Sequence, residues 1–266
     1  MRIIRFIDEK DRICFGHNYK KDTATLLEGY LFHEFKDTNR RVRVTKLLAP
    51  LMPAAILCIG LNYRQHANET GMKLPKYPPL FMKNPASVTN PGDPIIIPPS
   101  CVDPPQVDYE AELAVVIGKK AINVPRTEAL DYVMGYTASN DVSARRWQKH
   151  AGAGQWIRGK SFDTFCPLGP ELITIDEIPS PQDLAIKCIL NGEVMQNANT
   201  SDMIFGVAEL IEYLSGSTTL LPGTIILTGT PGGVGYIRKP PVYLKPGDLI
   251  AVQIERIGLL ENPVIL

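Results

Sequence analysis

Three acidic residues stand at alternate positions where an apolar segment of the chain begins. They are Asp108, Glu110 and Glu112 in VDYEAELAVVIGK, residues 107–119, and the apolar half of this stretch is typical of a buried strand. Alternate side chains of a strand share a face, so the three carboxylates are predicted to point the same way. A solvated edge is the commoner setting for such a pattern, but this strand enters the core at once. We therefore expect Glu112 near or below the surface, where a cluster of carboxylates requires a cation.

A further carboxylate, Asp141, lies in ASNDVSARRWQ between a strand-like segment and an expected helix. One interpretation is that Asp141 caps this helix. The other is that it joins Glu110 and Glu112 in a cage of oxygen ligands without histidine or cysteine. Such a set suits Mg²⁺, Mn²⁺ or Ca²⁺ better than zinc, and Mg²⁺ would keep open positions for water or substrate. Spacing leaves both interpretations open.

A histidine and a glutamate form a second candidate group in NYRQHANETG, where a helix is expected to end at Gly71. His66 and Glu69 are three residues apart, so they would be neighbours on this helix. The carboxylate could orient and polarise the imidazole as a general base that activates water or moves a proton. A plain surface contact is the alternative, and it is the commoner role of a lone histidine near a glutamate.

A glycine-rich loop, TGTPGGVG, follows a strand-like segment near the C-terminus. It lacks the GK[ST] ending of a phosphate-binding P-loop and does not match G-x-G-x-x-G, so nucleotide binding is rejected. The preferred interpretation is a tight loop whose backbone N–H groups and Thr230 hydroxyl hold a substrate carboxylate. A purely structural turn is the alternative.

The elements that would position these residues are mostly strands. Alternating segments, RIIRFIDE and RVRVTKLLAP, predict a small β-rich N-terminal module over residues 1–52, followed by a catalytic domain over residues 53–266. Ten of the 23 prolines fall in residues 74–105, which excludes long helices there. TEALDYVMGYTASND predicts a helix and then a strand, and SARRWQKHAG a short helix. Many strands with few helices favour a β-rich α+β domain over a doubly wound sheet.

The composition excludes several classes of partner. Lys plus Arg equals Asp plus Glu at 28 each in 266 residues, so bulk charge indicates neither nucleic acid nor an anionic membrane as a partner. No apolar run approaches the roughly 20 residues that span a bilayer. The N-terminus lacks the features of a signal or transit peptide, and the five scattered cysteines are typical of reduced core residues. We expect a cytoplasmic protein.

Five stretches together resemble the fumarylacetoacetate hydrolase superfamily. They are DYEAELAVVIGK, GYTASNDVSARRWQ, GKSFDTFCPLGP, NGEVMQNANTSDMIF and PGTIILTGTPGGVG. The resemblance runs from about residue 54 to the C-terminus. KSFDTFCPLGP and RKPPVYLKPGD are most similar to the group named fumarylacetoacetate hydrolase domain-containing protein 2, whose N-terminal module the first 50 residues fit only loosely.

The resemblance implies a mixed β-roll or barrel fold, a homodimer, and an ion at the positions of Glu110, Glu112 and Asp141. This ion would be Mg²⁺ or Mn²⁺. Asp108 is not a ligand in the family pattern, so we place it either behind the ligands or on the surface. Two of the three acids in VDYEAELAVVIGK, Glu110 and Glu112, are thus expected ligands, together with the more distant Asp141.

The resemblance also implies roles for residues that the sequence leaves ambiguous. His66 and Glu69 match a catalytic pair of acylpyruvase-type relatives. Lys160, which would otherwise be a surface lysine, is placed in the site, where its charge would offset the carboxylates and could bond to an enolate oxygen. Arg145 and Gln148 lie three apart on the expected helix and match substrate-facing residues, with a solvated helix face as the alternative.

The implied substrates are small 2-oxo or 1,3-diketo acids, whose enolate a divalent ion would stabilise. We first expect C–C bond cleavage, either acylpyruvate-type hydrolysis or oxaloacetate decarboxylation. An oxaloacetate keto–enol tautomerase or isomerase is the near-equal alternative, because all three reactions use the same ligands. A protein of another class, which binds a metabolite on this fold without catalysis, is disfavoured by His66, Glu69 and Lys160.

Overall fold

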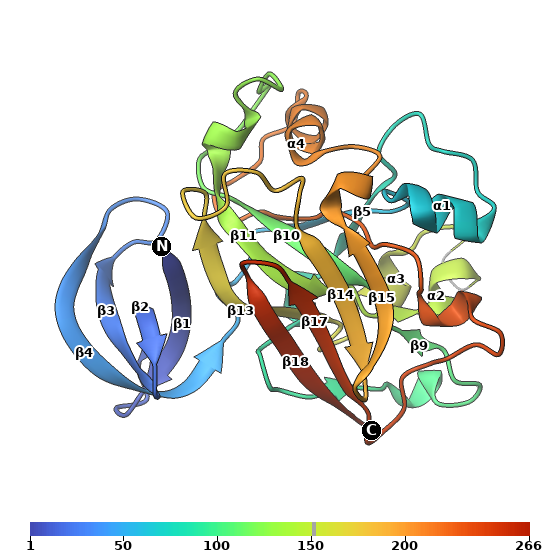
Figure 1. The fold of residues 1–266 in the computed structure, drawn as a ribbon, viewed down its shortest axis with the longest axis horizontal. Helices are drawn as coiled ribbons and strands as arrows, with labels where there is room; N and C mark the ends of the chain where they lie inside the picture. Colours follow the sequence, from blue (N-terminus) through green and yellow to red (C-terminus); the bar gives the residue numbers. More distant parts are fainter. Residues whose placement is uncertain (151–152) are drawn as a thin grey trace.

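The first strands of the chain form a small β module at one end of the molecule (Figure 1). The computed structural model describes residues 1–150 and 153–266. The module contains antiparallel strands β1 (Arg2–Asp8), β2 (Ile13–Lys20), β3 (Thr23–Gly29) and β4 (Phe35–Leu48). Because β2 pairs with both β1 and β3, and β4 pairs with both β3 and β1, these strands close into a ring. Alternate side chains fill its interior, as the alternating sequence predicts: Ile4, Phe6, Ala24, Leu26 and Val44.

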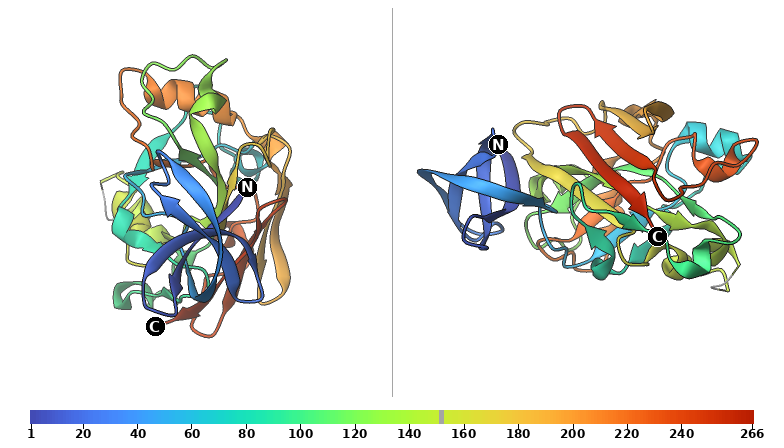
Figure 2. Two further views of the ribbon diagram at one scale, coloured as in Figure 1. Left: turned by 90° about the vertical axis from the view of Figure 1, so that its left-hand side faces the viewer. Right: turned by 90° about the horizontal axis from the view of Figure 1, so that it is seen from below.

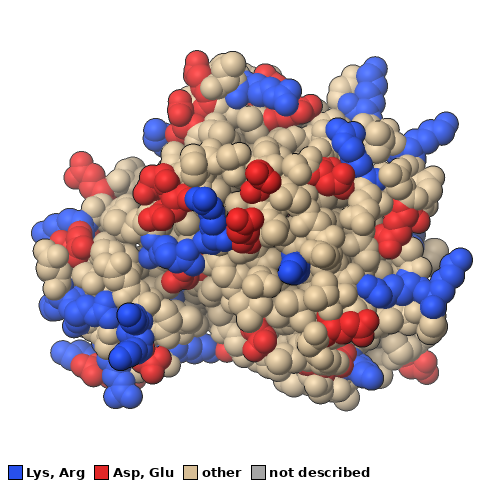
Figure 3. Space-filling model, viewed as in Figure 1, with Lys and Arg blue, Asp and Glu red and all other residues tan. Residues whose placement is uncertain are grey.

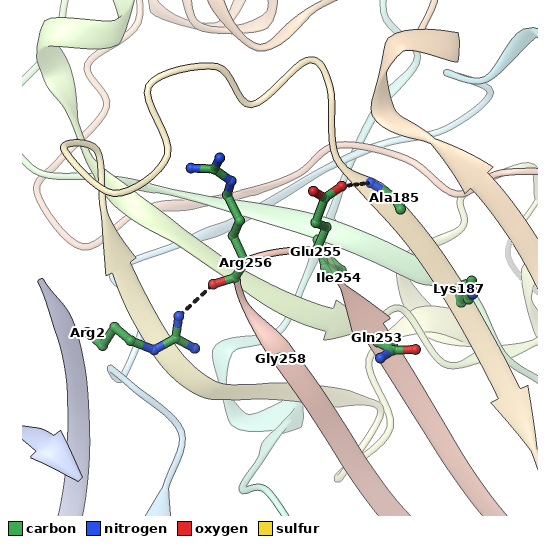
Figure 4. A pocket seen from close by; sticks show the side chains of 8 residues that line it. All are labelled: Arg2, Ala185, Lys187, Gln253, Ile254, Glu255, Arg256 and Gly258. Atoms are coloured by element: carbon green, nitrogen blue, oxygen red, sulfur yellow. Dashed lines mark hydrogen bonds between the residues drawn. The ribbon is translucent and has the colours of Figure 1, made fainter.

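The module is joined to the rest of the chain through a shared strand edge. Strand β1 also pairs with β13 (Cys166–Thr174), so the module continues the larger sheet. The Arg2 guanidinium donates to the backbone oxygens of Arg256 and Ile257, each at 2.7 Å. Figure 4 shows the first of these bonds at a cavity of about 420 Å³ beside the C-terminal strands. Figure 2 shows the module as a lobe at the end of the long axis.

The larger sheet places a buried strand at the centre of the molecule. Beyond β13 its order is β11 (Val133–Asn140), β10 (Ala111–Ile117), β16 (Ile225–Leu227), β5 (Ile56–Ile59) and β6 (Leu80–Lys83). The β16–β5 pair is parallel, and a short strand β7 (Val88–Thr89) runs parallel to β13. All residues of β10 are buried, which confirms the expected core strand.

A second sheet covers one side of the first. Its order is β15 (Glu193–Asn199), β14 (Ala185–Leu190), β17 (Leu249–Ile254), β18 (Gly258–Ile265) and β8 (Ile95–Ile96). Alternate residues of β14 and β17 point inward and share one apolar core with β10 and β11. The two layers confirm the β-rich α+β class.

Short helices lie at the end opposite the module and carry several candidate site residues (Figure 1). They are α1 (Arg64–Thr70), α2 (Arg145–Lys149) and α3 (Ile157–Lys160), while α4 (Val207–Ser215) packs elsewhere against the core. A two-stranded ribbon of β9 (Val107–Asp108) and β12 (Ser143–Ala144) lies beside them. Helix α1 ends at Gly71, whose φ of 66° is the left-handed conformation that glycine favours, as predicted.

The structure contradicts two local expectations from the sequence and confirms a third. The helix expected before β11 is only a 3₁₀ turn over Ala129–Tyr132, because the β-branched and aromatic residues that follow are drawn into sheet pairing. From the sequence alone we expect His17 to be an ordinary surface histidine, but it is buried, and its Nε2 lies 2.7 Å from Asp37. The cysteines are free thiols, buried except for the half-buried Cys14. Among the described residues, no helix has the length and apolar character needed to cross a membrane.

Candidate active site

Three carboxylates from neighbouring strands meet at one edge of the larger sheet. Glu110 precedes β10, Glu112 lies on it, and Asp141 follows β11, which pairs antiparallel with β10. The Asp141 N–H donates to the Glu110 carbonyl at 2.9 Å, which keeps the two chain segments together. One oxygen from each carboxylate lies within 4.8 Å of the others, and all three residues are buried. The structure therefore brings the expected ligand set together.

Asp141 is not a helix cap. Helix α2 begins at Arg145 after Ala144, and the Asp141 side chain makes no capping bond to it. Its Oδ1 instead accepts a hydrogen bond from Lys83 Nζ at 2.5 Å, and its Oδ2 accepts one from Lys160 Nζ at 2.6 Å. The capping interpretation is wrong because the carboxylate points into the cluster rather than toward the first turn of the helix.

Buried cations hold two of the three carboxylates. Lys160 Nζ donates to Glu110 Oε2 at 2.8 Å as well as to Asp141, and Arg145 Nη1 lies 2.5 Å from Glu110 Oε1. Burial alone would raise the pKa of Glu110, but Lys160 and Arg145 outweigh it and bring this pKa down to about 2. Burial likewise works to lower the Lys160 pKa, and Asp141 and Glu110 reverse the effect, so it lies above its usual value. Glu110 and Lys160 are therefore ionised at neutral pH.

Glu112 differs from its neighbours because, among the described residues, no cation is bonded to it, although the charge of Lys160 acts on it from a distance. Its Oε2 accepts the Gly229 N–H at 2.8 Å, and within residues 1–150 and 153–266 no ion pair reaches it. Burial raises the pKa of Glu112 well above its usual value, and the charges of Asp141 and Glu110 raise it further. A divalent cation among these oxygens would supply the missing positive charge, so the residues fit such an ion.

Asp108 lies behind the cluster rather than in it. It is fully buried, and its Oδ2 accepts from Arg145 Nε at 2.8 Å. The backbone N–H groups of Gly235 and Tyr236 donate to it at 2.8 and 3.0 Å. A surface position is thus wrong, and the supporting position is the one observed. The strand breaks between β9 and β10, which directs Asp108 to Arg145.

Arg145 and Gln148 share the inner face of α2. Both are buried, and Arg145 Nη1 donates to Gln148 Oε1 at 3.1 Å. The guanidinium carbon lies 4.4 Å from the centre of the Tyr236 ring. Burial works to lower the pKa of Arg145, but Asp108 and Glu110 hold it above the usual value. The solvated-face alternative is wrong, since this face points into the protein.

His66 and Glu69 lie together on α1, as the spacing predicts. Their closest atoms, Nδ1 and Oε2, are 3.5 Å apart, which is the outer limit of a hydrogen bond. Glu69 Oε2 also accepts the Gly233 N–H at 2.9 Å, so it links α1 to the glycine-rich loop. Burial lowers the pKa of His66, and Glu110 and Glu69 only partly offset this effect. The imidazole is therefore neutral at neutral pH and able to accept a proton.

Thr230 belongs to the glycine-rich loop, and its hydroxyl is already bonded. It donates to the Ala111 carbonyl at 3.0 Å and accepts from Gln196 Nε2 at 2.8 Å. These bonds tie the loop to the start of β10. Thr230 reaches the same cavity as the other candidates, but its hydroxyl hydrogen points to the backbone.

One cavity of about 210 Å³ collects these residues. Its polar wall contains residues from α1, α2 and α3, from the segment just before β10, and from the glycine-rich loop and the residue after it: His66, Glu110, Arg145, Gln148, Lys149, Lys160, Thr230 and Tyr236. Its apolar wall contains Leu61, Met72, Phe81 and Trp156, with Gly60 beside them. The larger cavity near Arg2 contains none of the acidic cluster, so the chemistry lies in the smaller one.

Sequence reasoning missed Lys83, Lys149, Trp156 and Tyr236. Lys83 ends β6, where Phe81 and Lys83 are the buried alternate residues. The alternation of LFMK could have placed the lysine beside Phe81 on the inner face. Its partner, Asp141, could not have been identified this way, because a contact across 58 positions depends on how the strands assemble.

Two family models match successive parts of the chain. Residues 55–265 match the family described as fumarylacetoacetate (FAA) hydrolase C-terminal, and residues 1–50 match the one described as Rv2993c-like, N-terminal. A relative from Dictyostelium discoideum, named fumarylacetoacetate hydrolase domain-containing protein 2 homolog, is 49% identical over 237 residues. This match covers 85% of the chain and 77% of the relative.

Two further matches carry the names of isomerising enzymes. Oxaloacetate tautomerase fahd2, mitochondrial, from Xenopus laevis is 50% identical over 220 residues, which is 82% of the chain and 68% of the relative. The crystal structure of a 5-carboxymethyl-2-hydroxymuconate delta-isomerase from Mycobacterium smegmatis has a TM-score of 0.86 and 35% identity. The match covers 100% of this chain and 99% of the isomerase chain.

The match over residues 55–265 spans most of the chain, and the structural match covers all of it. Together they establish the fold and identify an enzyme of the superfamily that the sequence resembles. The chain belongs to the fumarylacetoacetate hydrolase family and is similar to its domain-containing protein 2 group.

Proposed function

We propose that this enzyme is a metal-dependent oxaloacetate keto–enol tautomerase, which moves a proton on a short 2-oxo acid. The observation that carries the proposal is the position of the acidic cluster. Its Glu110 lines the same cavity of about 210 Å³ as the neutral His66, with the uncompensated Glu112 beside Glu110. A cation site and a proton acceptor at one small cavity are what enolisation requires.

Glu110, Glu112 and Asp141 would hold the ion. The set consists of carboxylate oxygens only, which favours Mg²⁺ or Mn²⁺. When bound, the ion would act as a Lewis acid for a 2-oxo acid and stabilise the charge of its enolate. Lys160 contributes a fixed ammonium between two of the carboxylates, so it would also donate toward an oxyanion in the cavity.

His66 is the proposed base. Tautomerisation needs a proton to leave C3 of oxaloacetate and a proton to reach the 2-oxo oxygen, and no C–C bond breaks. The neutral imidazole can accept the first proton, and Glu69 stabilises the imidazolium that forms. Arg145 and Gln148 would orient the substrate from α2, while Thr230 holds the glycine-rich loop in place.

C–C cleavage, the first expectation from the sequence, is the second candidate. His66 and Glu69 could activate water for acylpyruvate-type hydrolysis, and loss of the β-carboxylate would give decarboxylation. The order of the two candidates is reversed because a relative at 50% identity carries the name oxaloacetate tautomerase. A binding protein without catalysis has less support, since His66, Glu69 and Lys160 are all present and brought to one site.

A single time course separates these reactions. Oxaloacetate dissolved as its enol is mixed with the enzyme and Mg²⁺, and enol absorbance and the NMR signals of pyruvate are followed together. The proposal predicts that the enol signal decays much faster than in buffer while pyruvate does not form faster. Rapid pyruvate formation would favour decarboxylation, and turnover of acetylpyruvate without effect on oxaloacetate would favour hydrolysis.

A homodimer and a cytoplasmic location complete the proposal. Figure 3 shows few charged side chains over β14, β17 and β18, and Leu249, Leu259 and Ile265 are exposed on the two C-terminal strands. An apolar face of this kind supports self-association, which sedimentation equilibrium tests. The location stays a prediction, because the name of the Xenopus relative includes mitochondrial. Fractionation of source cells tests it.

A further inference from the structure

Lys149 is a cation at the rim of the active-site cavity, and no carboxylate is bonded to it in the part of the chain that the structure describes. It is the last residue of α2 and lines the cavity, with an exposed side chain. Its Nζ lies 3.9 Å from the centre of the Tyr236 ring.

The other cations of the site differ in this respect. Arg145 is bonded to Asp108 and Glu110, Lys160 to Glu110 and Asp141, and Lys83 to Asp141. Their charges are therefore engaged before any substrate arrives. Lys149 forms no such ion pair, so its ammonium could pair with an anion that enters the cavity at the rim.

Tyr236 fixes the position of this charge. Its backbone N–H donates to the buried Asp108, and its ring is contacted by the Arg145 guanidinium as well as by the Lys149 ammonium. The aromatic face attracts both cations, but their like charges repel each other. Partial burial lowers the pKa of Lys149, Arg145 lowers it further, and the buried Asp108 only partly offsets the two effects. A carboxylate near Lys149 and Tyr236 would relieve this repulsion.

The volume of the cavity and its apolar wall limit the size of the ligand. Trp156 packs edge-on against Phe81, with ring centres 5.3 Å apart. The indole also lies so close to Gly60 that a Cβ there would be 2.8 Å from it. Trp156 and Gly60 thus leave no space between them on this wall, and a cavity of about 210 Å³ suits an acid of few carbons.

We propose that Lys149, with Tyr236, binds the second carboxylate of a short dicarboxylic 2-oxo acid and so selects diacids over monoacids. The proposal rests on the proposed function, in which the first carboxylate and the 2-oxo group occupy the acidic cluster's end of the cavity. Lys149, at the rim, then binds the carboxylate at the far end of the same molecule. Lys149 is a specificity-determining residue rather than part of the proton transfer.

Oxaloacetate and its 4-methyl ester provide matched probes, because they differ in the charge of the second carboxyl group. Their dissociation constants for the full chain with Mg²⁺ are measured by calorimetry for four proteins: wild type, Lys149→Met, Lys149→Arg and the control Lys120→Met. Lys120 is an exposed lysine outside the site. The rate of enol–keto conversion of both probes is measured in parallel.

Wild type is expected to bind oxaloacetate about 10-fold or more tightly than the ester, the usual worth of a hydrogen bond between charged groups. Lys149→Met should abolish this preference while it leaves ester binding nearly unchanged. Lys149→Arg and Lys120→Met should keep it, and added salt should reduce it in wild type. A preference that survives in Lys149→Met, or is absent in wild type, overturns the proposal.

Failure of the proposed reaction gives a different result. If a Lys149-dependent preference in binding occurs without faster enol–keto conversion, the tautomerase assignment fails and the diacid site stands. If both probes are converted and bound equally well, the tautomerase assignment stands and the diacid site fails.

Discussion

The ammonium of Lys83 lies 2.5 Å from Oδ1 of Asp141, and both side chains are fully buried. Lys160 approaches the other oxygen of the same carboxylate at 2.6 Å. Asp141 is thus fixed from two sides, once by β6 and once by α3. The direction of a proposed metal ligand therefore depends on a lysine from the far edge of the sheet.

Replacement of Lys83 should weaken both the fold and the ion site. In Lys83→Met, Asp141 keeps only Lys160, and the loss of one partner of a buried ion pair costs about 3–5 kcal/mol in the free energy of unfolding. Metal affinity should fall about 10–100-fold, as when a group that orients a ligand is removed. Urea unfolding and calorimetric titration with Mn²⁺ measure the two effects. If Lys83→Met matches the surface control Lys120→Met in both, Lys83 has no positioning role.

Glu112→Gln should separate ion binding from folding. The substitution removes an uncompensated buried carboxylate, so the metal-free protein should unfold at the same or a higher temperature than wild type. The stabilisation that wild type gains from Mg²⁺, about 2.7 kcal/mol at 100 times the dissociation constant, should vanish. Differential scanning calorimetry with and without the ion measures both quantities.

Asp108→Asn is the matched control for this experiment. Asp108 is equally buried and lies four residues earlier, but it is bonded to Arg145 rather than to the cluster. It should keep the stabilisation by Mg²⁺ while the substrate KM rises, because Arg145 is less well held. Loss of the Mg²⁺ effect in Asp108→Asn, with retention in Glu112→Gln, would mean that the wrong acids are assigned.

The pH dependence of turnover should report on His66. Burial lowers its pKa, so the neutral base persists below the ordinary value of about 6.5, and kcat/KM should decline only as the pH falls through that lowered pKa. Glu69 works to raise this pKa. Glu69→Gln should therefore move the acid limb to lower pH, and it should reduce kcat/KM by about 100-fold or more.

Two results would count against this assignment. An acid limb above about 6.5 in wild type would have the wrong sign for a buried histidine base. Small and equal losses in His66→Ala and Glu69→Gln for oxaloacetate and acetylpyruvate would mean that α1 only covers the cavity. Ion binding should persist in both variants, because neither residue belongs to the acidic cluster.

Local periodicity accounts for the parts of the site that could be predicted. Glu110 and Glu112 face one way because they enter a buried strand, and residues three apart on α1 and α2 lie on common faces. The same rule misplaced Asp108, since the strand breaks between β9 and β10. Sequence periodicity does not predict such a break, which depends on the Arg145 guanidinium and on the N–H groups near Tyr236.

Contacts between distant segments could not be predicted in this way. Lys160 and Lys83 reach the carboxylates across the assembled sheet, and single lysines in polar stretches are usually solvated. The resemblance to a family located Lys160 but not Lys83. The prediction of a helix before β11 is wrong for a related reason. Pairing of β11 with β10 outweighs the helical spacing of a few residues.

The central claim is that enolisation at this site depends on an ion held by the acidic cluster. Its most direct test is the rate of enol-to-keto conversion of oxaloacetate by one enzyme preparation, measured with Mg²⁺, after EDTA, and after Mg²⁺ or Mn²⁺ is restored. The account predicts rapid conversion, loss to the rate in buffer, and recovery, with no recovery in Glu112→Gln. Undiminished conversion by the EDTA-treated wild-type enzyme would contradict it.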